Sequence, residues 1–221
     1  MQPIRIRFKK QGRARFISHL DLNRCMARAI RRANIPVWYT QGFNPHPYIT
    51  FALPLSIFYG GQCEIMDARI DGEMPLEEVK QRLAAQMPEG IEILDVCEPV
   101  MKAADCAFAR YEITFEFEGI AADKLNAMLH GLLVQADITI EKTTKHGTRE
   151  VDLKPYLINE SAHFRVEDGI ISFEVVLPAS NQENLNPSCF TAALLKYAEV
   201  VPDLEQITRT EIYNAEMQPF K

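Results

Sequence analysis

The sequence predicts an α+β protein made of two consecutive units, each with an antiparallel sheet and helices on one face. Three observations predict this fold class. The chain has 221 residues, enough for two domains of ordinary size, about 100 residues each. Its hydrophobic share of 47% is that of folded globular proteins. Short alternating segments and longer amphipathic segments follow one another in a similar order in both halves.

The first half begins with a strand and an amphipathic helix. Residues 4–9 (IRIRFK) alternate apolar and basic side chains, the pattern of a strand with one buried face. A helix is expected from His19 to Ala33, because Ser18 and Asp21 have the spacing of an N-terminal capping box.

The remaining segments complete a ferredoxin-like order in the first half. We expect a short strand near 37–40, an extended apolar segment at 48–58 that continues past Gly60-Gly61 into 63–70, a second helix near 75–86 and a strand at 91–97. The resulting order, β-α-β-β-α-β, is that of a ferredoxin-like unit.

The second half is expected to repeat this order with one extra hairpin. We expect helices near 121–134 and 187–198 and strands near 111–118, 138–141, 149–153, 164–166, 170–177 and 207–213. The sequence therefore predicts a basic N-terminal ferredoxin-like unit at 1–98, a connector at 99–110 and an acidic C-terminal unit at 111–221.

Charge is distributed unevenly along the chain. The formal net charge is −6, but residues 1–50 hold ten basic residues and one acidic residue, Asp21. This segment therefore carries +9 and the remainder −15. Such asymmetry indicates a polyanionic partner for the basic segment, or pairing between the two parts of the chain.

The cysteines indicate neither a metal site nor a disulfide framework. The five cysteines contain no CxxC pair and no CxxxCxxC run, so we expect reduced thiols and no metal or other cofactor in this chain. No window approaches about 18 apolar residues, and the N-terminus has no apolar signal region. The sequence therefore predicts a cytoplasmic protein that does not enter the membrane.

One side of the helix at 19–33 is expected to bind a polyanion such as RNA. Leu22, Met26 and Ile30 fall on the side expected to be buried, and arginines occupy the opposite side. The predicted nucleic-acid-binding residues, including two in the preceding turn, are Arg13, Arg15, Arg24, Arg28, Arg31 and Arg32. The alternative is a solvated helix face.

The basic side of the first strand has two interpretations. Arg5, Arg7 and Lys9 match an acidic row in the second half, formed by Glu112, Glu116 and Glu118. The two rows either pair with each other or line an open charged cleft.

A loop with two prolines is a candidate recognition element. Its candidate residues are Gly42, Phe43, Asn44 and His46. The prolines restrict the backbone, and rigidly held loops often carry function. The alternative is a structural corner, with Phe43 filling the core and His46 capping a backbone group.

Two histidines are weak candidates for catalysis. His19 lies at a predicted helix N-terminus, where it could contact an anion or act as a general acid or base, and His46 lies in the loop. Asp21 is interpreted as a helix cap.

Three segments carry a resemblance to a known family. The segment from Arg15 to Ser56 (RFISHLDLNRCMARAIRRANIPVWYTQGFNPHPYITFALPLS) resembles the signature of the radical-SAM-linked proteins, a bacterial family of unknown function. TREVDLKPYL and ITRTEIYN resemble the later motifs of that family. Its members occur alone or attached to B12-binding radical SAM proteins. The resemblance implies a radical SAM protein as partner and supplies no catalytic residues.

Three functions remain open from the sequence. The first is a non-enzymatic, accessory RNA-binding module that positions RNA for a radical SAM partner. The second is a metal-independent RNA-processing endonuclease with His19 or His46 as general acid or base, because tandem ferredoxin-like units with a histidine near a basic helix also describe the CRISPR repeat-RNA endonucleases. The third is an adaptor that binds proteins. No RNP1-type motif is present to identify an RNA reader.

Overall fold

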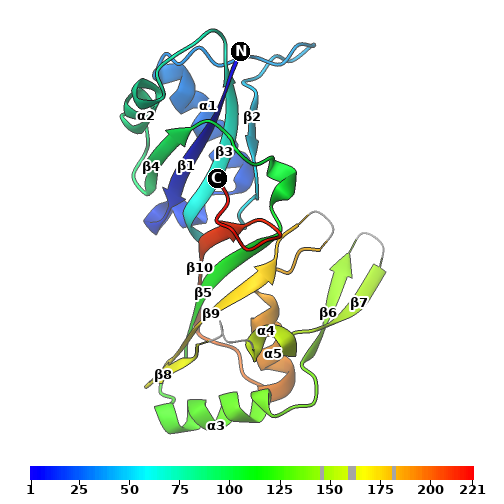
Figure 1. Cartoon of the computed structure of the whole chain (residues 1–221). Coiled ribbons are helices and arrows are strands. Elements are labelled where there is room, and N and C mark those ends of the chain that lie inside the picture. The colour runs from blue at the N-terminus through cyan, green and yellow to red at the C-terminus, as the bar shows by residue number, and fades with distance from the viewer. Residues whose placement is uncertain (145–146, 159–162, 181–182) are drawn as a thin grey trace. The chain divides into compact units, whose positions relative to one another are not determined.

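A computed structural model of the chain describes residues 1–144, 147–158, 163–180 and 183–221 (Figure 1). The chain divides into two compact units, which we call unit 1 (Met1–Ala107 with Arg209–Lys221) and unit 2 (Phe108–Thr208). Within the described residues, five α-helices accompany sheets whose strand pairings are antiparallel wherever the register is defined. The predicted α+β class is confirmed.

Unit 1 contains the predicted β-α-β-β-α-β order. Its elements are β1 (Gln2–Lys10), the 3₁₀ helix η1 (Gly12–Phe16), α1 (His19–Arg32), β2 (Ile49–Phe51), β3 (Gly60–Ile70), α2 (Leu76–Ala84), β4 (Ile91–Cys97) and the 3₁₀ helix η2 (Ala103–Asp105). β1 lies between β4 and β3, and β2 pairs with Met66–Ala68 of β3 along the edge opposite β1. The predicted strand at 37–40 is wrong, because Val37 and Tyr39 form only isolated bridges.

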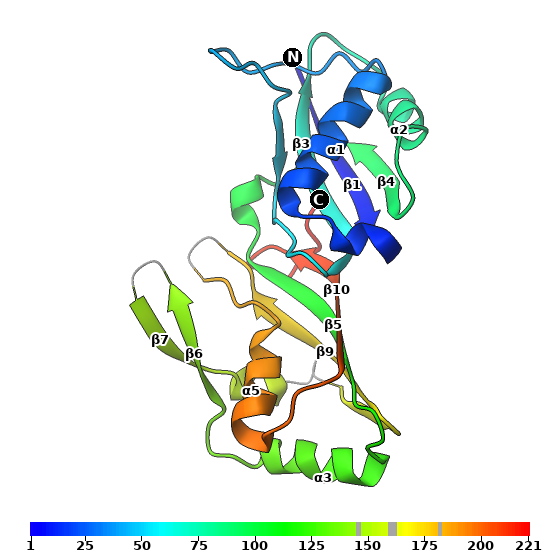
Figure 2. The same ribbon diagram turned by 180° about the vertical axis from the view of Figure 1, so that it is seen from behind.

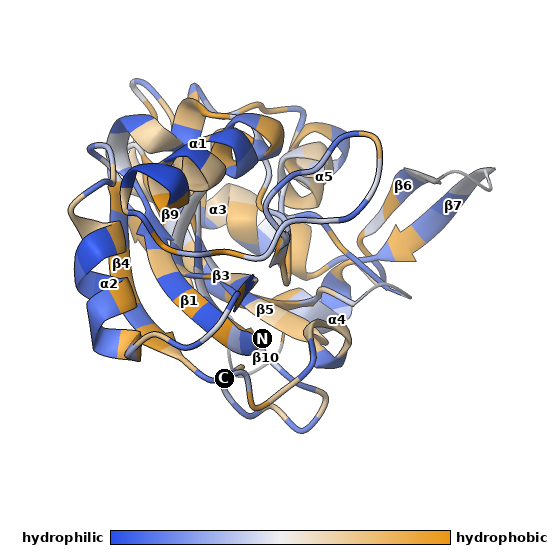
Figure 3. Cartoon of the chain, turned by 90° about the horizontal axis from the view of Figure 1, so that it is seen from above, coloured by the Kyte–Doolittle hydropathy of each residue, from blue (hydrophilic) through white to orange (hydrophobic). Residues whose placement is uncertain are grey.

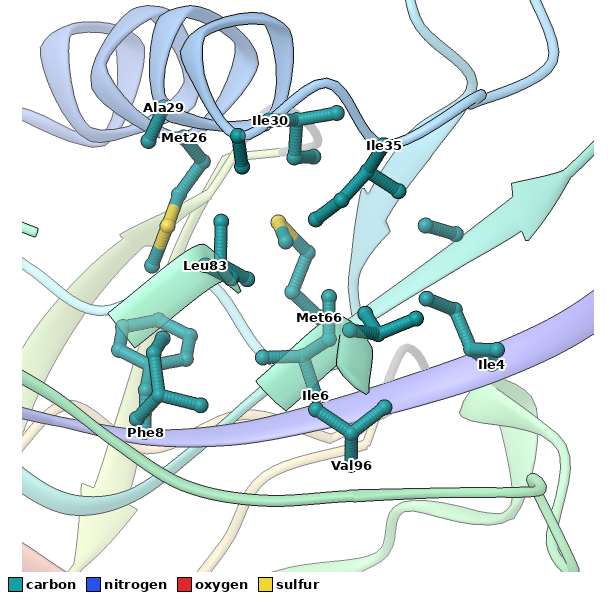
Figure 4. Packing of buried hydrophobic residues seen from close by; sticks show 14 of the residues in the cluster. Ile4, Ile6, Phe8, Met26, Ala29, Ile30, Ile35, Met66, Leu83 and Val96 are labelled. Atoms are coloured by element: carbon teal, nitrogen blue, oxygen red, sulfur yellow. The ribbon is translucent and has the colours of Figure 1, made fainter. Parts of the chain in front are cut away.

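Helices α1 and α2 cover one face of the unit 1 sheet (Figure 2). The alternation along β1, visible as bands of colour in Figure 3, turns Ile6 and Phe8 toward these helices. Met26 and Ile30 of α1 point down onto them and onto Met66 (Figure 4). The predicted burial of Leu22, Met26 and Ile30 is confirmed, since each is at most 2% exposed. Full burial of one such side chain contributes about 1.5–3 kcal/mol.

Local signals set both ends of α1. The backbone N–H of Asp21 donates to Ser18 Oγ at 3.1 Å, which satisfies one of the free donors of the first turn. The helix ends at Arg32 with Ala33 as its C-cap, and Asn34 then takes a left-handed conformation with φ of 52°. The helix predicted from the sequence is confirmed.

Unit 2 contains a longer series of elements. They are β5 (Phe108–Glu116), α3 (Ala122–Leu133), β6 (Thr139–Thr144), β7 (Gly147–Asp152), α4 (Lys154–Leu157), β8 (Arg165–Glu167), β9 (Ile170–Pro178), α5 (Cys189–Ala198) and β10 (Leu204–Tyr213). The strand order is β10-β5-β9-β8, and β6 with β7 forms a separate two-stranded sheet. Phe115, Phe173 and Phe190 form an aromatic core with α3 and α5.

Two features differ from the predicted organisation. The strand β10 is hydrogen-bonded to both β3 and β5, so the prediction of two separate sheets is wrong. The boundary between the units falls within β10, after Thr208, and the last 13 residues group with unit 1. Two tandem ferredoxin-like units are therefore not confirmed. Among the described residues, no helix is long and apolar enough to cross a membrane.

Candidate functional site

Two exposed phenylalanines are in contact just before the start of α1: Phe16, the last residue of η1, and Phe58. Phe16 is 61% exposed and Phe58 is 56% exposed, and their rings pack edge to face with centroids 6.0 Å apart. We call them the aromatic pair. Water-exposed phenyl rings are unfavourable for a chain that has no partner to cover them. The pair is therefore the first candidate for a binding surface.

Hydrogen bonds to Arg15 fix the position of the aromatic pair. The Phe58 N–H donates to the Arg15 carbonyl at 2.8 Å, and Arg15 Nε donates back to the Phe58 carbonyl at 3.0 Å. Phe58 has a φ of 74°, a left-handed conformation that is costly for a bulky residue. The reciprocal hydrogen bonds to Arg15 offset this strain and join segments that lie 43 residues apart.

A glycine allows η1 to pack closely against the end of the sheet. The Gln11 N–H donates to the Gly90 carbonyl at 2.8 Å. Gly90 has a φ of 86°, and a Cβ atom there would lie 2.5 Å from the Gln11 carbonyl oxygen. Only glycine fits this close approach, which holds the turn that carries Arg13, Arg15 and Phe16.

Most of the predicted arginines are exposed, and three of them are free. Within the described part of the chain, Arg13, Arg28 and Arg31 make no hydrogen bond or ion pair and face solvent. Arg24 lies 3.4 Å from Asp21 in a solvent-exposed pair, which contributes little. The side of α1 that carries Arg24, Arg28 and Arg31 is thus open to a ligand.

Arg32 is engaged within unit 1. Its Nη2 donates to the Gln86 carbonyl at 2.8 Å, and its Nε donates to Gln86 Oε1 at 3.3 Å. The guanidinium therefore caps the chain just after α2 and joins the two helices. Arg32, one of the predicted binding residues, therefore stabilises the packing of α1 against the end of α2.

A buried group of charges lies behind η1. We call Lys10, Glu64 and Arg209 the buried charge cluster, because each is at most 2% exposed. Arg209 Nε donates to Glu64 Oε1 at 3.0 Å, and its Nη2 bonds Glu64 Oε2 and the Leu53 carbonyl. Lys10 Nζ has one long contact, 3.4 Å to the Arg15 carbonyl. Two buried cations therefore face one carboxylate.

A second glycine makes room for the carboxylate of this cluster. A Cβ atom at Gly61 would lie 2.2 Å from Glu64 Oε1. Gly61 is also the strand partner of Lys10. The Gly60-Gly61 sequence thus lets Glu64 turn toward the helix side of the sheet, where an apolar residue would be usual.

His19 adjoins this cluster and has an unsatisfied nitrogen. Its ring packs edge to face on Phe51 at 4.9 Å, and its buried Nδ1 has no partner among the described residues. Burial lowers the pKa of His19 below its usual value, and the nearby Lys10 charge lowers it further, with Glu64 opposing. Burial likewise lowers the pKa of Lys10. The positive charges near His19 thus outweigh the effect of Glu64 on its pKa.

Asp21 has the capping role that the sequence indicates. Its carboxylate accepts a hydrogen bond from Ser18 Oγ at 2.7 Å. This hydrogen bond is the main reason that the pKa of Asp21 is lowered.

The loop around His46 is a closed, projecting hairpin (Figure 1). Thr40 Oγ1 lies 3.1 Å from His46 Nδ1 and accepts from the His46 N–H at 3.2 Å. Gly42 has a φ of 144°, and Phe43 is fully exposed at the tip. The interpretation of Phe43 as a core residue is wrong. No contact among the described residues joins His46 to His19, so the structure does not bring the two candidate catalytic residues together.

Arg5 is structural. Its guanidinium is fully buried and makes two 2.7 Å hydrogen bonds to Asp67, with further bonds to the Met101 and Lys221 carbonyls. It also lies 4.7 Å from the centre of the Phe220 ring. Lys9 pairs with Glu92 at 3.3 Å. Arg5 is thus held inside unit 1 and is not available to a ligand.

The five cysteines are free thiols, and Cys63, Cys106 and Cys189 are buried. Burial raises the pKa of Cys106 to about 11 and that of Cys189 to about 12, and it raises the pKa of Cys63 further still. No group of three or more His, Cys, Asp or Glu residues in the described ranges is arranged to hold a metal.

Sequence reasoning missed the aromatic pair and the buried charge cluster. Glu64 did carry a signal, because it continues the alternation of Met66, Ala68 and Ile70, which are apolar and buried. Arg209 lies in the ITRTEIYN segment but gave no sign of its partner. Phe58 gave no local signal of its exposure.

Comparisons with known proteins give a family and no function. A family model described as an uncharacterised protein conserved in bacteria matches residues 3–187. No curated protein matches the chain. A solved structure of an unknown protein from Galdieria sulphuraria is 14% identical over 94% of this chain and 96% of that chain, with a TM-score of 0.27.

Proposed function

Since the chain belongs to the bacterial family of uncharacterised conserved proteins designated DUF2344, we propose a function from its own surface: it is an accessory module that binds single-stranded RNA. The proposed contact surface, which we call the η1–α1 surface, consists of the aromatic pair, Arg13, Arg15 and the exposed arginines Arg24, Arg28 and Arg31 of α1. Arg32 lies at its far end.

The aromatic pair carries this proposal. Proteins that bind single-stranded nucleic acid commonly combine exposed aromatic rings with basic side chains, because every base can stack on an aromatic ring. Phe16 and Phe58 are each more than half exposed, and hydrogen bonds to Arg15 hold Phe58 in place. Binding through phosphate contacts alone would not require exposed aromatic rings.

The arginines supply the second part of the interaction. Each guanidinium that neutralises a phosphate releases counterions, which makes binding stronger at low salt. Arg13, Arg28 and Arg31 have no partner among the described residues, so binding RNA breaks no existing ion pair at these positions. A planar guanidinium also suits bidentate contact with phosphate oxygens.

The partner and the location are proposed from the resemblance to radical-SAM-linked proteins. In this proposal the chain acts in the cytoplasm and presents RNA to a radical SAM protein, which supplies the chemistry. The cysteines of this chain are buried or widely spaced, which supports placing any iron–sulfur cluster in the partner. Co-purification of the two proteins from a native host is the test.

We also propose that both units derive from the ferredoxin-like fold. Their strand orders, β4-β1-β3 with β2 and β10-β5-β9-β8, correspond if β6, β7 and α4 are an insertion. The sequence-based ranges 1–98, 99–110 and 111–221 stay a prediction in this scheme. Expression of each range alone, with circular dichroism as readout, tests it.

The test of RNA binding is fluorescence anisotropy with a labelled single-stranded RNA. Stacking contributes about 1–3 kcal/mol per base, so Phe16→Ala with Phe58→Ala should weaken binding by about 5- to 150-fold. Leu195→Ala is the control, because Leu195 is also exposed (55%) but lies on α5 of unit 2. Unchanged affinity in the double variant would overturn the proposal. Cleaved RNA, lost on His19→Ala or His46→Ala, would favour the endonuclease instead, and absence of RNA binding would favour the adaptor.

A further inference from the structure

The region behind the aromatic pair is rich in positive charge. Lys10 and Arg209 are both buried, and Glu64 is the carboxylate that faces them. Arg15 adds a further positive charge close to Lys10. An uncompensated buried cation is unfavourable, and an anion that binds beside it relieves that cost.

Unused hydrogen-bond donors point to the same place. His19 Nδ1 is buried and has no partner among the described residues, and the neutral ring can carry its proton on either nitrogen. Lys10 Nζ has three protons and one long hydrogen bond, 3.4 Å to the Arg15 carbonyl. His19 is also the first residue of α1, where backbone N–H groups and the helix dipole favour an anion, and the Asp21 carboxylate, bonded to Ser18, lies in the same turn.

These donors are linked directly to the aromatic pair. The Arg15 carbonyl accepts from Lys10 Nζ and from the Phe58 N–H, so one carbonyl joins the buried cation to the exposed ring. His19 follows Phe16 by three residues in the chain. Lys10 and His19 are therefore close neighbours of the aromatic pair, through the Arg15 carbonyl and along the chain.

We propose that Lys10, His19 and the first turn of α1 bind a phosphate monoester, the terminal phosphate of a single-stranded RNA whose end bases stack on the aromatic pair. This inference rests on the proposed function. A terminal phosphate is close to dianionic at neutral pH, whereas an internal phosphodiester carries one charge. A site with excess buried positive charge therefore prefers the terminus.

The experiment compares full-length protein binding to four RNAs of one sequence, with a 5′-phosphate, a 5′-hydroxyl, a 3′-phosphate or a 3′-hydroxyl end. One phosphorylated end should bind at least tenfold more tightly than its hydroxyl counterpart. Lys10→Met should abolish this preference and leave affinity for the hydroxyl-ended RNAs within about twofold. Lys9→Met is the matched control, because Lys9 directly precedes Lys10 in β1 but is partly exposed and pairs with Glu92. His19→Asn provides a second variant if Lys10→Met does not fold.

Each outcome has a definite meaning. Equal affinity for all four RNAs, or a preference that survives both Lys10→Met and His19→Asn, overturns the phosphate site and leaves RNA binding intact. If no RNA binds, the proposed function fails, and inorganic phosphate then tests the site alone. In that arm a saturable shift of the His19 ring resonances in the NMR spectrum, absent in Lys10→Met, supports a site for free phosphate. No saturable shift overturns it.

Discussion

Replacement of Glu64 by glutamine tests the electrostatic account of unit 1. Glutamine has nearly the same shape as glutamate, so it fits over Gly61 and keeps one acceptor for Arg209. The change removes the one negative charge of the buried charge cluster and leaves Lys10 and Arg209 buried together. Breaking a buried pair in this way costs about 3–5 kcal/mol, because the remaining charge cannot return to water.

Thermal unfolding followed by circular dichroism measures the effect. For chains of about 150–250 residues, 1 kcal/mol shifts Tm by about 2–4 °C, so Glu64→Gln should lower Tm by about 6–20 °C. Glu92→Gln is the control: it removes an equal charge from the exposed pair with Lys9 and should change stability by less than about 1 kcal/mol.

Lys10→Met completes this test. Methionine keeps the length of the side chain and removes one buried cation, and the Arg15 carbonyl still accepts from the Phe58 N–H. Burial already lowers the pKa of Lys10, so the single change should leave stability unchanged or raise it. Added to Glu64→Gln, it should restore part of the lost stability. A loss in Glu64→Gln no larger than that of Glu92→Gln would refute the reasoning.

Three further predictions follow from the same contacts. Changing Arg24, Arg28 and Arg31 together to Gln should keep stability within about 0.5 kcal/mol and flatten the log–log salt slope of RNA binding by about two units, as measured by anisotropy at several salt concentrations. Because the folded state lowers the pKa of His19, the unfolded chain binds more protons, and wild-type stability should fall as pH drops through about 6.5. His19→Asn should show a smaller drop in Tm between pH 8 and pH 5 than the wild type. An equal drop would contradict the conclusion that His19 causes the pH dependence. Cys189, whose pKa burial raises to about 12, and Cys63 should react with a thiol reagent only when the chain unfolds, whereas the less buried Cys25 and Cys97 should react first. Mass spectrometry of labelled peptides measures the order.

The local pattern of the sequence predicted the parts of unit 1 that depend on periodicity. The alternation of β1 and the amphipathic character of α1 identified which side chains pack between them, and Ser18 marked the start of the helix. Arg28 and Arg31 are exposed as predicted, because they lie on the side of α1 opposite the buried Leu22, Met26 and Ile30. Arg32 differs, since its partner Gln86 lies 54 residues away and leaves no trace in the local pattern.

Tertiary contacts decided what the pattern left open. Arg5 lies on the outer face of β1 as the alternation requires, but Asp67 and the C-terminal segment around Phe220 bury it. The exposure of Phe58 depends on a left-handed backbone that Arg15 stabilises from a distant segment. Glu64 was the exception that sequence could have revealed, as a charge at an inward strand position.

Photochemical crosslinking of the wild-type protein to single-stranded RNA that contains 4-thiouridine tests the proposed interface most directly. Mass spectrometry then identifies the crosslinked residues. If the η1–α1 surface binds RNA, the adducts should lie on Phe16, Phe58 or the residues next to them, and high salt should reduce their yield. Adducts confined to Phe43 and the projecting loop, or spread over unit 2 at the same yield, would contradict the account.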